Sequence, residues 1–213
     1  MKTHDTPEKT YDLERLIFFS DGVFAIAITI LVIELHPPEG WDGSWGSLLH
    51  TLFGRVICYV ISFSALACFW TAHRFIFRHV QKFSEPASLL NLAFLLAISL
   101  MPFANAMLLE HVTQPVAVQA YIGLISIAGT IMALLWAYLA LIARHIDSRI
   151  GLGFRWLVFF RLLLMPPLLS FSSVWVGQHF GVLPSIIFTT VIAAVAGRFG
   201  FKPMPSEPSV KEL

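Results

Sequence analysis

Charged residues are scarce in this chain. Of its 213 residues, 57% are hydrophobic and only 13% are charged, and the mean hydropathy is +0.76. A soluble domain carries roughly 25% charged residues, so this composition excludes an ordinary soluble protein and indicates an integral membrane protein. The net charge of +1 carries little information, and we expect a lipid bilayer, not nucleic acid, around the protein.

Other features are missing as well. The two cysteines, Cys58 and Cys68, are too far apart on one apolar segment for a disulfide and are interpreted as small core residues. No short apolar segment with a cleavage site precedes Arg15, so we expect no cleavable signal peptide. No histidine pair has the spacing of metal ligands, so we expect no enzyme, no cofactor and no tightly bound metal.

Long apolar runs predict six transmembrane helices, since about 20 apolar residues cross a bilayer core. The predicted spans are 16–35, 51–72, 88–109, 115–142, 156–176 and 181–197. The expected fold class is all-α, a polytopic membrane protein with one domain over residues 1–200. Residues 201–213 form a proline-rich tail that we expect to be disordered. Pro102 and Pro166-Pro167 predict kinks or breaks within their helices.

Basic residues predict the orientation. They occur at the N-terminal segment, in the second and fourth connections and in the tail: Lys2, Lys9, Arg15, Arg74, Arg78, Lys82, Arg144, Arg149, Arg155, Arg198, Lys202 and Lys211. By the positive-inside rule both termini are cytoplasmic, and we expect a plasma or inner membrane protein. Arg55 and Arg161 lie inside apolar runs, where we interpret them as snorkelling to the headgroups, with a buried functional pair as the alternative.

The first predicted helix carries an aspartate, Asp21, within its apolar run. An ionisable residue in such a helix normally faces protein or water and has a function or a partner. At about 100° per residue, Asp21 points roughly 120° away from a separate stripe. That stripe gathers residues within roughly 60° of one direction: Arg15, Gly22, Ile26, Thr29, Ile30 and Ile33.

Two ordinary explanations stay open for these features. By periodicity alone, the stripe is more typical of lipid contact or core packing than of a pore. The polar patch around Asp21 is more typical of a hydrogen-bond cluster that fixes the register of helices. Candidate partners lie at the end of the second predicted helix and in the third: Trp70, His73, Asn91 and Ser99.

The string Arg15-x-x-x-Phe19-Ser20-Asp21, at the start of a six-helix chain, resembles the signature of the transmembrane protein 175 family of potassium channels. Residues 22–29 are similar to the first helix of the bacterial members. Two further elements are also similar, namely Trp70-x-x-His73-Arg74 and the stretch from Asn91 to Pro102-Phe103. The resemblance is specific over the first three predicted helices and generic over the last three.

The resemblance implies a leak-type potassium channel that assembles as a homotetramer, with the first helices lining the pore. It implies that Ile26 forms the narrowest ring, that Ile30 and Ile33 follow outward, and that Thr29 adds a hydroxyl. Gly22 would line the same pore. A polar scaffold behind the pore helix would contain Arg15, Phe19, Ser20, Asp21, Trp70, His73 and Asn91.

Selectivity would then come from an apolar ring. The sequence has no Thr-Val-Gly-Tyr-Gly run, so no carbonyl cage replaces the water around the ion. A narrow apolar ring forces partial dehydration, which disfavours sodium because sodium holds water more tightly than potassium. The alternative is a proton-coupled or proton-permeable transporter that uses Asp21 and His73. Such transporters normally show inverted repeats and broken helices, and here only Pro166-Pro167 suggests a break without a counterpart.

Overall fold

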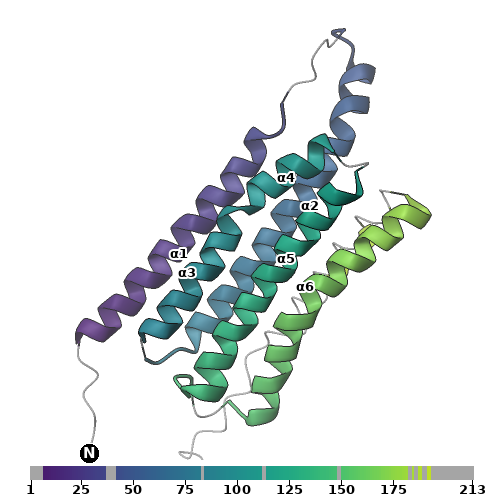
Figure 1. Ribbon diagram of the computed structural model, residues 1–213. Helices are drawn as coiled ribbons and strands as arrows, with labels where there is room; N and C mark the ends of the chain where they lie inside the picture. Colours follow the sequence, from purple (N-terminus) through teal and green to yellow (C-terminus); the bar gives the residue numbers. More distant parts are fainter. Residues whose placement is uncertain are drawn as a thin grey trace, which may run out of the picture.

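The computed structural model describes residues 7–36, 42–82, 84–111, 114–147 and 150–181, together with Pro184, Ile187, Phe188, Val191 and Ile192. This part of the chain is almost entirely helical, and the helices run side by side in one bundle (Figure 1). The bridge between Val80 and Ile146 is the single β-type pairing within it. The predicted all-α class is confirmed.

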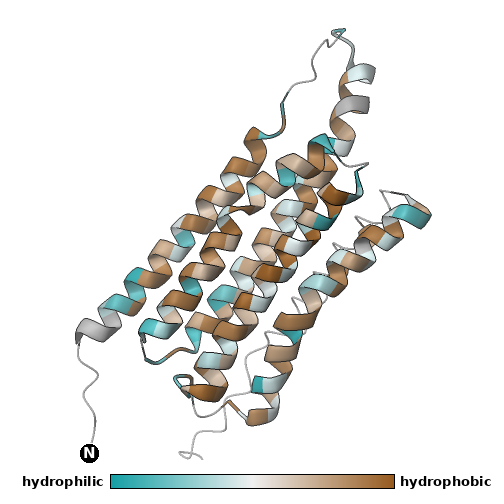
Figure 2. Ribbon diagram, viewed as in Figure 1, coloured by the Kyte–Doolittle hydropathy of each residue, from teal (hydrophilic) through white to brown (hydrophobic). Residues whose placement is uncertain are grey.

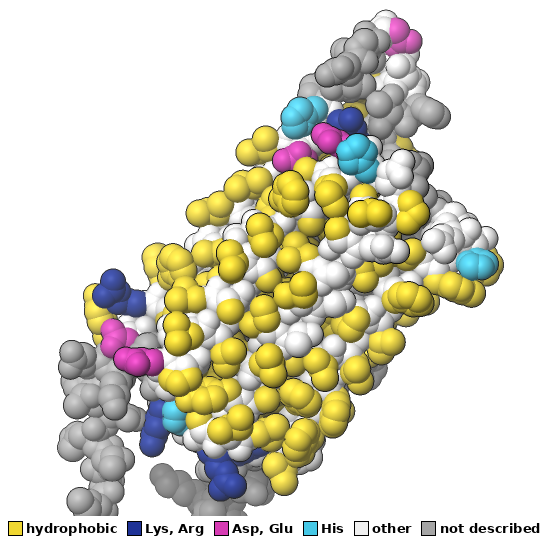
Figure 3. Space-filling view, in the orientation of Figure 1, with side chains coloured by type: hydrophobic (Ala, Val, Ile, Leu, Met, Phe, Trp, Pro, Cys, Tyr) yellow, Lys and Arg dark blue, Asp and Glu magenta, His cyan; other side chains and the backbone are white. Residues whose placement is uncertain are grey.

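The described helices are α1 (Pro7–Ile33), α2 (Trp45–Arg78), α3 (Glu85–Ser99), α4 (Met101–Glu110), α5 (Pro115–Ala137), the π-helical segment η1 (Tyr138–Ile142) and α6 (Leu152–Phe180). Five stretches are long and apolar enough to cross a membrane: Tyr11–Ile33, Trp45–Arg78, Glu85–Glu110, Pro115–Ile142 and Leu152–Phe180. Along α1, hydrophilic positions gather near the N-terminal end and hydrophobic ones follow (Figure 2). Charged side chains gather at the two ends of the molecule, and the flank between them is hydrophobic (Figure 3).

The third predicted span, 88–109, is two helices and not one. Helix α3 ends at Ser99 and α4 begins at Met101, with Leu100 between them. Pro102 lies in the first turn of α4, where backbone N–H groups have no partner within the helix, so the missing N–H of proline costs nothing there. In the middle of one continuous helix the same proline would remove a backbone hydrogen bond, so the break follows from its position.

Helix α6 differs from the prediction at its C-terminal end. It continues through Gly177, which was expected in a connection, and ends at Phe180. The next residue, Gly181, has a φ of +89°, which is unfavourable for other residues. Pro166 and Pro167 lie inside α6, which bends in its middle, and its second half diverges from α5 (Figure 1). The predicted sixth helix, 181–197, is described only at scattered positions, and the tail 201–213 lies outside the described residues.

Helix α5 lies at the centre of the bundle, where it packs against α3, α4 and α6. At its crossing with α6 a side chain has no room, because a Cβ on Gly129 would lie 2.6 Å from Cγ of Pro166. Arg155 of α6 then binds the segment that connects the two helices at the end of the bundle. Its Nε donates to the carbonyl of Ile150 at 2.9 Å and its Nη1 to that of Ala140 at 2.6 Å.

The cysteines are free thiols, as predicted. Cys58 is half-buried, but Cys68 is exposed on the surface of the chain, so the interpretation of Cys68 as a core residue is wrong. The reason is its position on α2: the neighbouring Leu66 and Phe69 occupy the face that packs inward. Cys68 therefore lies outside the packed face of α2.

Candidate functional site

Helix α1 has one packed face and one open face. Ser20, Phe24, Ala27 and Leu31 recur every three or four residues and are at most 3% exposed. They pack against α2, α3 and α4. The opposite face carries every residue of the predicted pore stripe, and it is left open by the described residues: Arg15, Gly22, Ile26, Thr29, Ile30 and Ile33.

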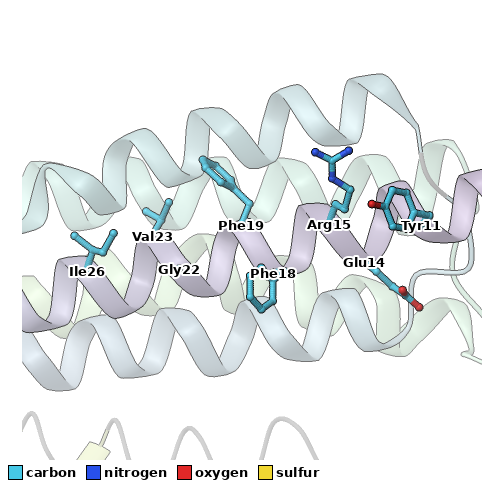
Figure 4. A pocket seen from close by; sticks show the side chains of 8 residues that line it. All are labelled: Tyr11, Glu14, Arg15, Phe18, Phe19, Gly22, Val23 and Ile26. Atoms are coloured by element: carbon cyan, nitrogen blue, oxygen red, sulfur yellow. The ribbon is translucent and has the colours of Figure 1, made fainter.

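The open face is hollowed near its N-terminal half. A groove of about 660 Å³ is lined, among the described residues, by side chains from α1, shown in Figure 4: Tyr11, Glu14, Arg15, Phe18, Phe19, Gly22, Val23 and Ile26. Gly22 leaves space here, since a Cβ at this position would meet nothing within 4 Å. A groove with walls from one helix is an open surface and not an enclosed site, and none of the other described helices closes it.

Behind the open face lies a buried hydrogen-bonded chain from α1 through α3 to α2, which we call the serine–asparagine–histidine cluster (Ser20, Asn91 and His73). Nδ2 of Asn91 donates to Oγ of Ser20 at 2.9 Å, and Nε2 of His73 lies 2.9 Å from Oδ1 of Asn91. An amide oxygen only accepts, so Nε2 of His73 carries the proton. All three side chains are at most 1% exposed. The cluster fixes α1 against two neighbours at one height.

Aromatic rings surround the imidazole of this cluster. The ring of Phe77 lies 4.5 Å from that of His73, and those of Phe24 and Phe94 lie 5.8 and 5.9 Å away. Nδ1 of His73 is buried and has no hydrogen-bond partner in the described protein. A neutral imidazole fits these surroundings, because a charged one would require a partner for each N–H.

A second contact, beside the first, joins α1 to α2. The indole Nε1 of Trp70 donates to Oδ1 of Asp21 at 2.9 Å, and the guanidinium of Arg74 lies 4.6 Å from the centroid of the Trp70 ring. Asp21 is half-buried. Its carboxylate therefore faces another helix, and it lies outside the open stripe as the helical wheel predicted.

Arg15 and Phe19 lie away from these two contacts. Both are exposed on the open face, and the guanidinium of Arg15 lies 5.6 Å from the centroid of the Tyr11 ring (Figure 4). In a single copy of the chain they line the groove and not the polar cluster. Ser99, a candidate partner by sequence, is exposed and donates to the carbonyl of Leu96 in its own helix.

Sequence reasoning missed a third polar group, the serine–asparagine–tyrosine cluster (Ser62, Asn105 and Tyr121), which joins α2, α4 and α5. Oγ of Ser62 donates to Oδ1 of Asn105 at 2.7 Å and lies 2.8 Å from Oη of Tyr121. Ser62 and Asn105 are fully buried. The available signal was Asn105 itself, because an amide within an apolar span needs a partner.

Metal ligands do not gather in the described part of the chain. No group of three or more histidine, cysteine, aspartate or glutamate side chains there is placed to hold a metal ion. The hydroxyls of Ser20 and Thr29 bond within α1: Ser20 donates to the carbonyl of Leu16 and Thr29 to that of Ala25, at 2.8 and 2.9 Å. The open face therefore offers mainly hydrocarbon to whatever lies in front of it.

The described architecture has counterparts among known proteins. The family model for the endosomal/lysosomal potassium channel TMEM175 matches residues 15–102, which include most of α1, all of α2 and α3, and both polar contacts of α1. A potassium channel of Chamaesiphon minutus is 31% identical over 194 residues, which cover 81% of this chain and 91% of that protein. The human endosomal/lysosomal proton channel TMEM175 is 24% identical over 200 residues, which cover 90% of this chain and 39% of the human protein.

A solved structure is also similar. It is the crystal structure of a lysosomal potassium-selective channel TMEM175 homolog from Chamaesiphon minutus, with a TM-score of 0.63 and 26% sequence identity. The match covers 88% of this chain and 98% of that chain, so it includes the helices that follow the residues of the family model.

Proposed function

Because the chain belongs to the TMEM175 family of ion channels, and not to a family of enzymes, we propose that it forms a potassium-selective pore of the leak type. Several copies, as a homotetramer in the plasma or inner membrane, place the open face of α1 around a common axis. Closed rotational symmetry is the usual arrangement of identical subunits, and it lets one helix per subunit enclose a path. Both termini are cytoplasmic in this arrangement.

The observation that carries this proposal is the division of α1 into two faces. Ile26 and Ile33 are 61% and 64% exposed in the single chain, although the opposite face of the same helix is buried. Here two polar contacts, at Ser20 and Asp21, hold the opposite side.

The mechanism follows from the chemistry of the open face. Ile26, Ile30 and Ile33 present branched aliphatic side chains, and the hydroxyl of Thr29 is bonded to its own helix. A ring of such side chains gives no oxygen ligand to an ion, so the ion keeps part of its water or passes when the ring widens and wets. Potassium holds its water less tightly than sodium and crosses more easily.

The polar contacts act on the pore indirectly. The serine–asparagine–histidine cluster and the Trp70–Asp21 contact set the height and rotation of α1, and these determine which side chains face the axis. Arg15 and Phe19 belong to the rim of the groove, where they meet a neighbouring copy of the chain in this proposal.

A second candidate function is proton permeation through Asp21 and His73. Two observations favour it: the related human protein is named a proton channel, and His73 is a buried imidazole with one unpartnered nitrogen. Against it, Asp21 bonds to Trp70 and His73 bonds to Asn91, so the described residues contain two separate contacts and not one relay.

Flux measurements in liposomes distinguish a potassium-selective pore from proton permeation. Purified protein is reconstituted with a potassium gradient and no pH gradient, and potassium efflux is followed together with internal pH. We expect passive potassium efflux that exceeds sodium efflux. Efflux that requires a pH gradient, or proton flux without potassium flux, would overturn the proposal in favour of the second candidate.

A further inference from the structure

The last two turns of α2 carry two arginines on one side. Thr71, Arg74, Phe75 and Arg78 follow one another at helical spacing and line a groove of about 210 Å³. Both arginines are exposed. We propose that this arginine groove binds the phosphate of an anionic membrane lipid, which no part of the proposed pore requires.

The electrostatics of the groove call for an anion. Neither guanidinium forms an ion pair with any residue in the described part of the chain. Like charges one turn apart destabilise a helix in the absence of a counter-charge. Asp21, the acid beside this region, accepts its hydrogen bond from Trp70, whose ring lies between it and Arg74.

The donors of the groove are prepared for a phosphate. The guanidinium of Arg74 is held over the Trp70 ring at 4.6 Å, so it loses little freedom on binding. The hydroxyl of Thr71 already donates to the carbonyl of Ala67, so the two guanidinium groups are the donors left. Arginine matches phosphate oxygens with two parallel hydrogen bonds.

The position of the groove relative to the membrane favours a lipid over a soluble anion as its ligand. Arg74 and Arg78 end a 34-residue apolar helix, so they lie where a span meets the headgroups. Basic sites at this level of a membrane protein bind anionic headgroups, and each cation contributes noticeably to the binding. A phosphodiester lies at the same depth in every leaflet, whereas free phosphate must be drawn from water.

The test uses the full-length protein and measures retained lipid. Protein purified from vesicles that contain phosphatidylcholine and phosphatidylglycerol is analysed by native mass spectrometry, and the two bound lipids are counted. We expect a preference for phosphatidylglycerol that falls about tenfold in the variant with both Arg74→Gln and Arg78→Gln. The matched control is Arg144→Gln, which removes an exposed arginine that does not line the groove.

The outcomes separate the possible occupants. An equal loss in Arg144→Gln would assign the preference to general charge and overturn the proposal. Release of phosphatidylglycerol by inorganic phosphate would show a site for a free anion and overturn it too, as would an unchanged preference in the double variant. If the double variant does not fold, Arg78→Gln alone decides, because Arg78 has no partner among the described residues whose loss would unfold the chain.

Discussion

The two faces of α1 belong to one membrane helix and are similarly hydrophobic. They differ in the residues that they contact. Phe24 is 1% exposed and packs among aromatic rings, whereas Phe18 is 83% exposed on the other side. Polar side chains are present on both, but among the described residues only Ser20 and Asp21, on the packed side, bond to another helix. The packed face therefore holds α1 in the subunit, and in the proposed channel the open face lines the path of the ion.

This comparison separates stability from conduction. A change on the packed face acts on the folding of one subunit, because partners within that subunit lose contacts. A change on the open face leaves those contacts intact and acts only where other copies or ions are present. Each of the following predictions pairs one substitution with a matched change, in order of decreasing effect on the stability of the folded subunit.

The largest effect is expected for Phe24→Ala. Removing a fully buried ring leaves a cavity among Phe69, Phe94 and His73, which costs roughly 3–5 kcal/mol. We expect a strong loss of folded protein, measured as the midpoint of thermal unfolding in detergent. The matched control is Phe18→Ala, which removes the same ring from the open face and is expected to shift the midpoint little. Equal shifts in both variants would contradict the division of α1 into two faces.

A smaller loss is expected for Asn91→Leu. The leucine fills the space but leaves Oγ of Ser20 and Nε2 of His73 without their partner, at roughly 1–3 kcal/mol for each buried group. The unfolding midpoint should fall, and potassium flux per folded channel should fall with it as α1 loses its register. Ser99→Ala serves as control because its hydroxyl bonds only within α3. An unchanged midpoint in Asn91→Leu would contradict the anchoring role of the cluster.

Much of this difference between the two faces of α1 was predictable from the sequence. Helical spacing predicted that Asp21 and Ser20 point away from the stripe that contains Ile26, and the structure places them so. The spacing worked because a straight helix keeps its angle of about 100° per residue whatever surrounds it. The pore-lining role of the stripe stays a prediction, since a single copy of the chain has no partner in front of that face.

Other features of the structure could not be predicted, because they depend on contacts between helices that no local sequence pattern indicates. The serine–asparagine–tyrosine cluster forms only because the break at Leu100 brings Asn105 against α2 and α5. Pro102 indicated a kink but not the direction of the chain after it. Arg15 and Phe19 belong to the same short signature as Ser20 and Asp21, yet they lie on the other face, because neighbours in sequence point to different sides of a helix.

On the open face, Ile26→Ala should change conduction while stability stays within about 0.5 kcal/mol. A smaller side chain widens and wets the constriction, so total cation flux should rise and the ratio of potassium to sodium should fall. Each 1.4 kcal/mol removed from the barrier raises flux about tenfold. Val32→Ala is the control, an exposed aliphatic residue of α1 outside the stripe. If Val32→Ala changed the ion ratio and Ile26→Ala did not, the assignment of the narrow ring to Ile26 would be wrong.

The smallest effect on the folded subunit is expected for Gly22→Ala, and it is the most direct test of what lies in front of α1. A Cβ at Gly22 meets nothing within 4 Å in a single copy, and alanine favours a helix by about 1 kcal/mol over glycine. The thermal midpoint of the subunit should therefore stay the same or rise. In an assembly that closes the groove, one added methyl per subunit narrows the path or pushes neighbouring copies apart. We expect a modest fall in potassium flux, measured in liposomes, with no loss of folded protein.

Gly153→Ala, at the start of α6, adds the same methyl in equally open space and should leave flux unchanged. A Gly22→Ala channel with the flux and subunit number of the parent would mean that the open face meets lipid, and the pore would then have to be sought on another helix.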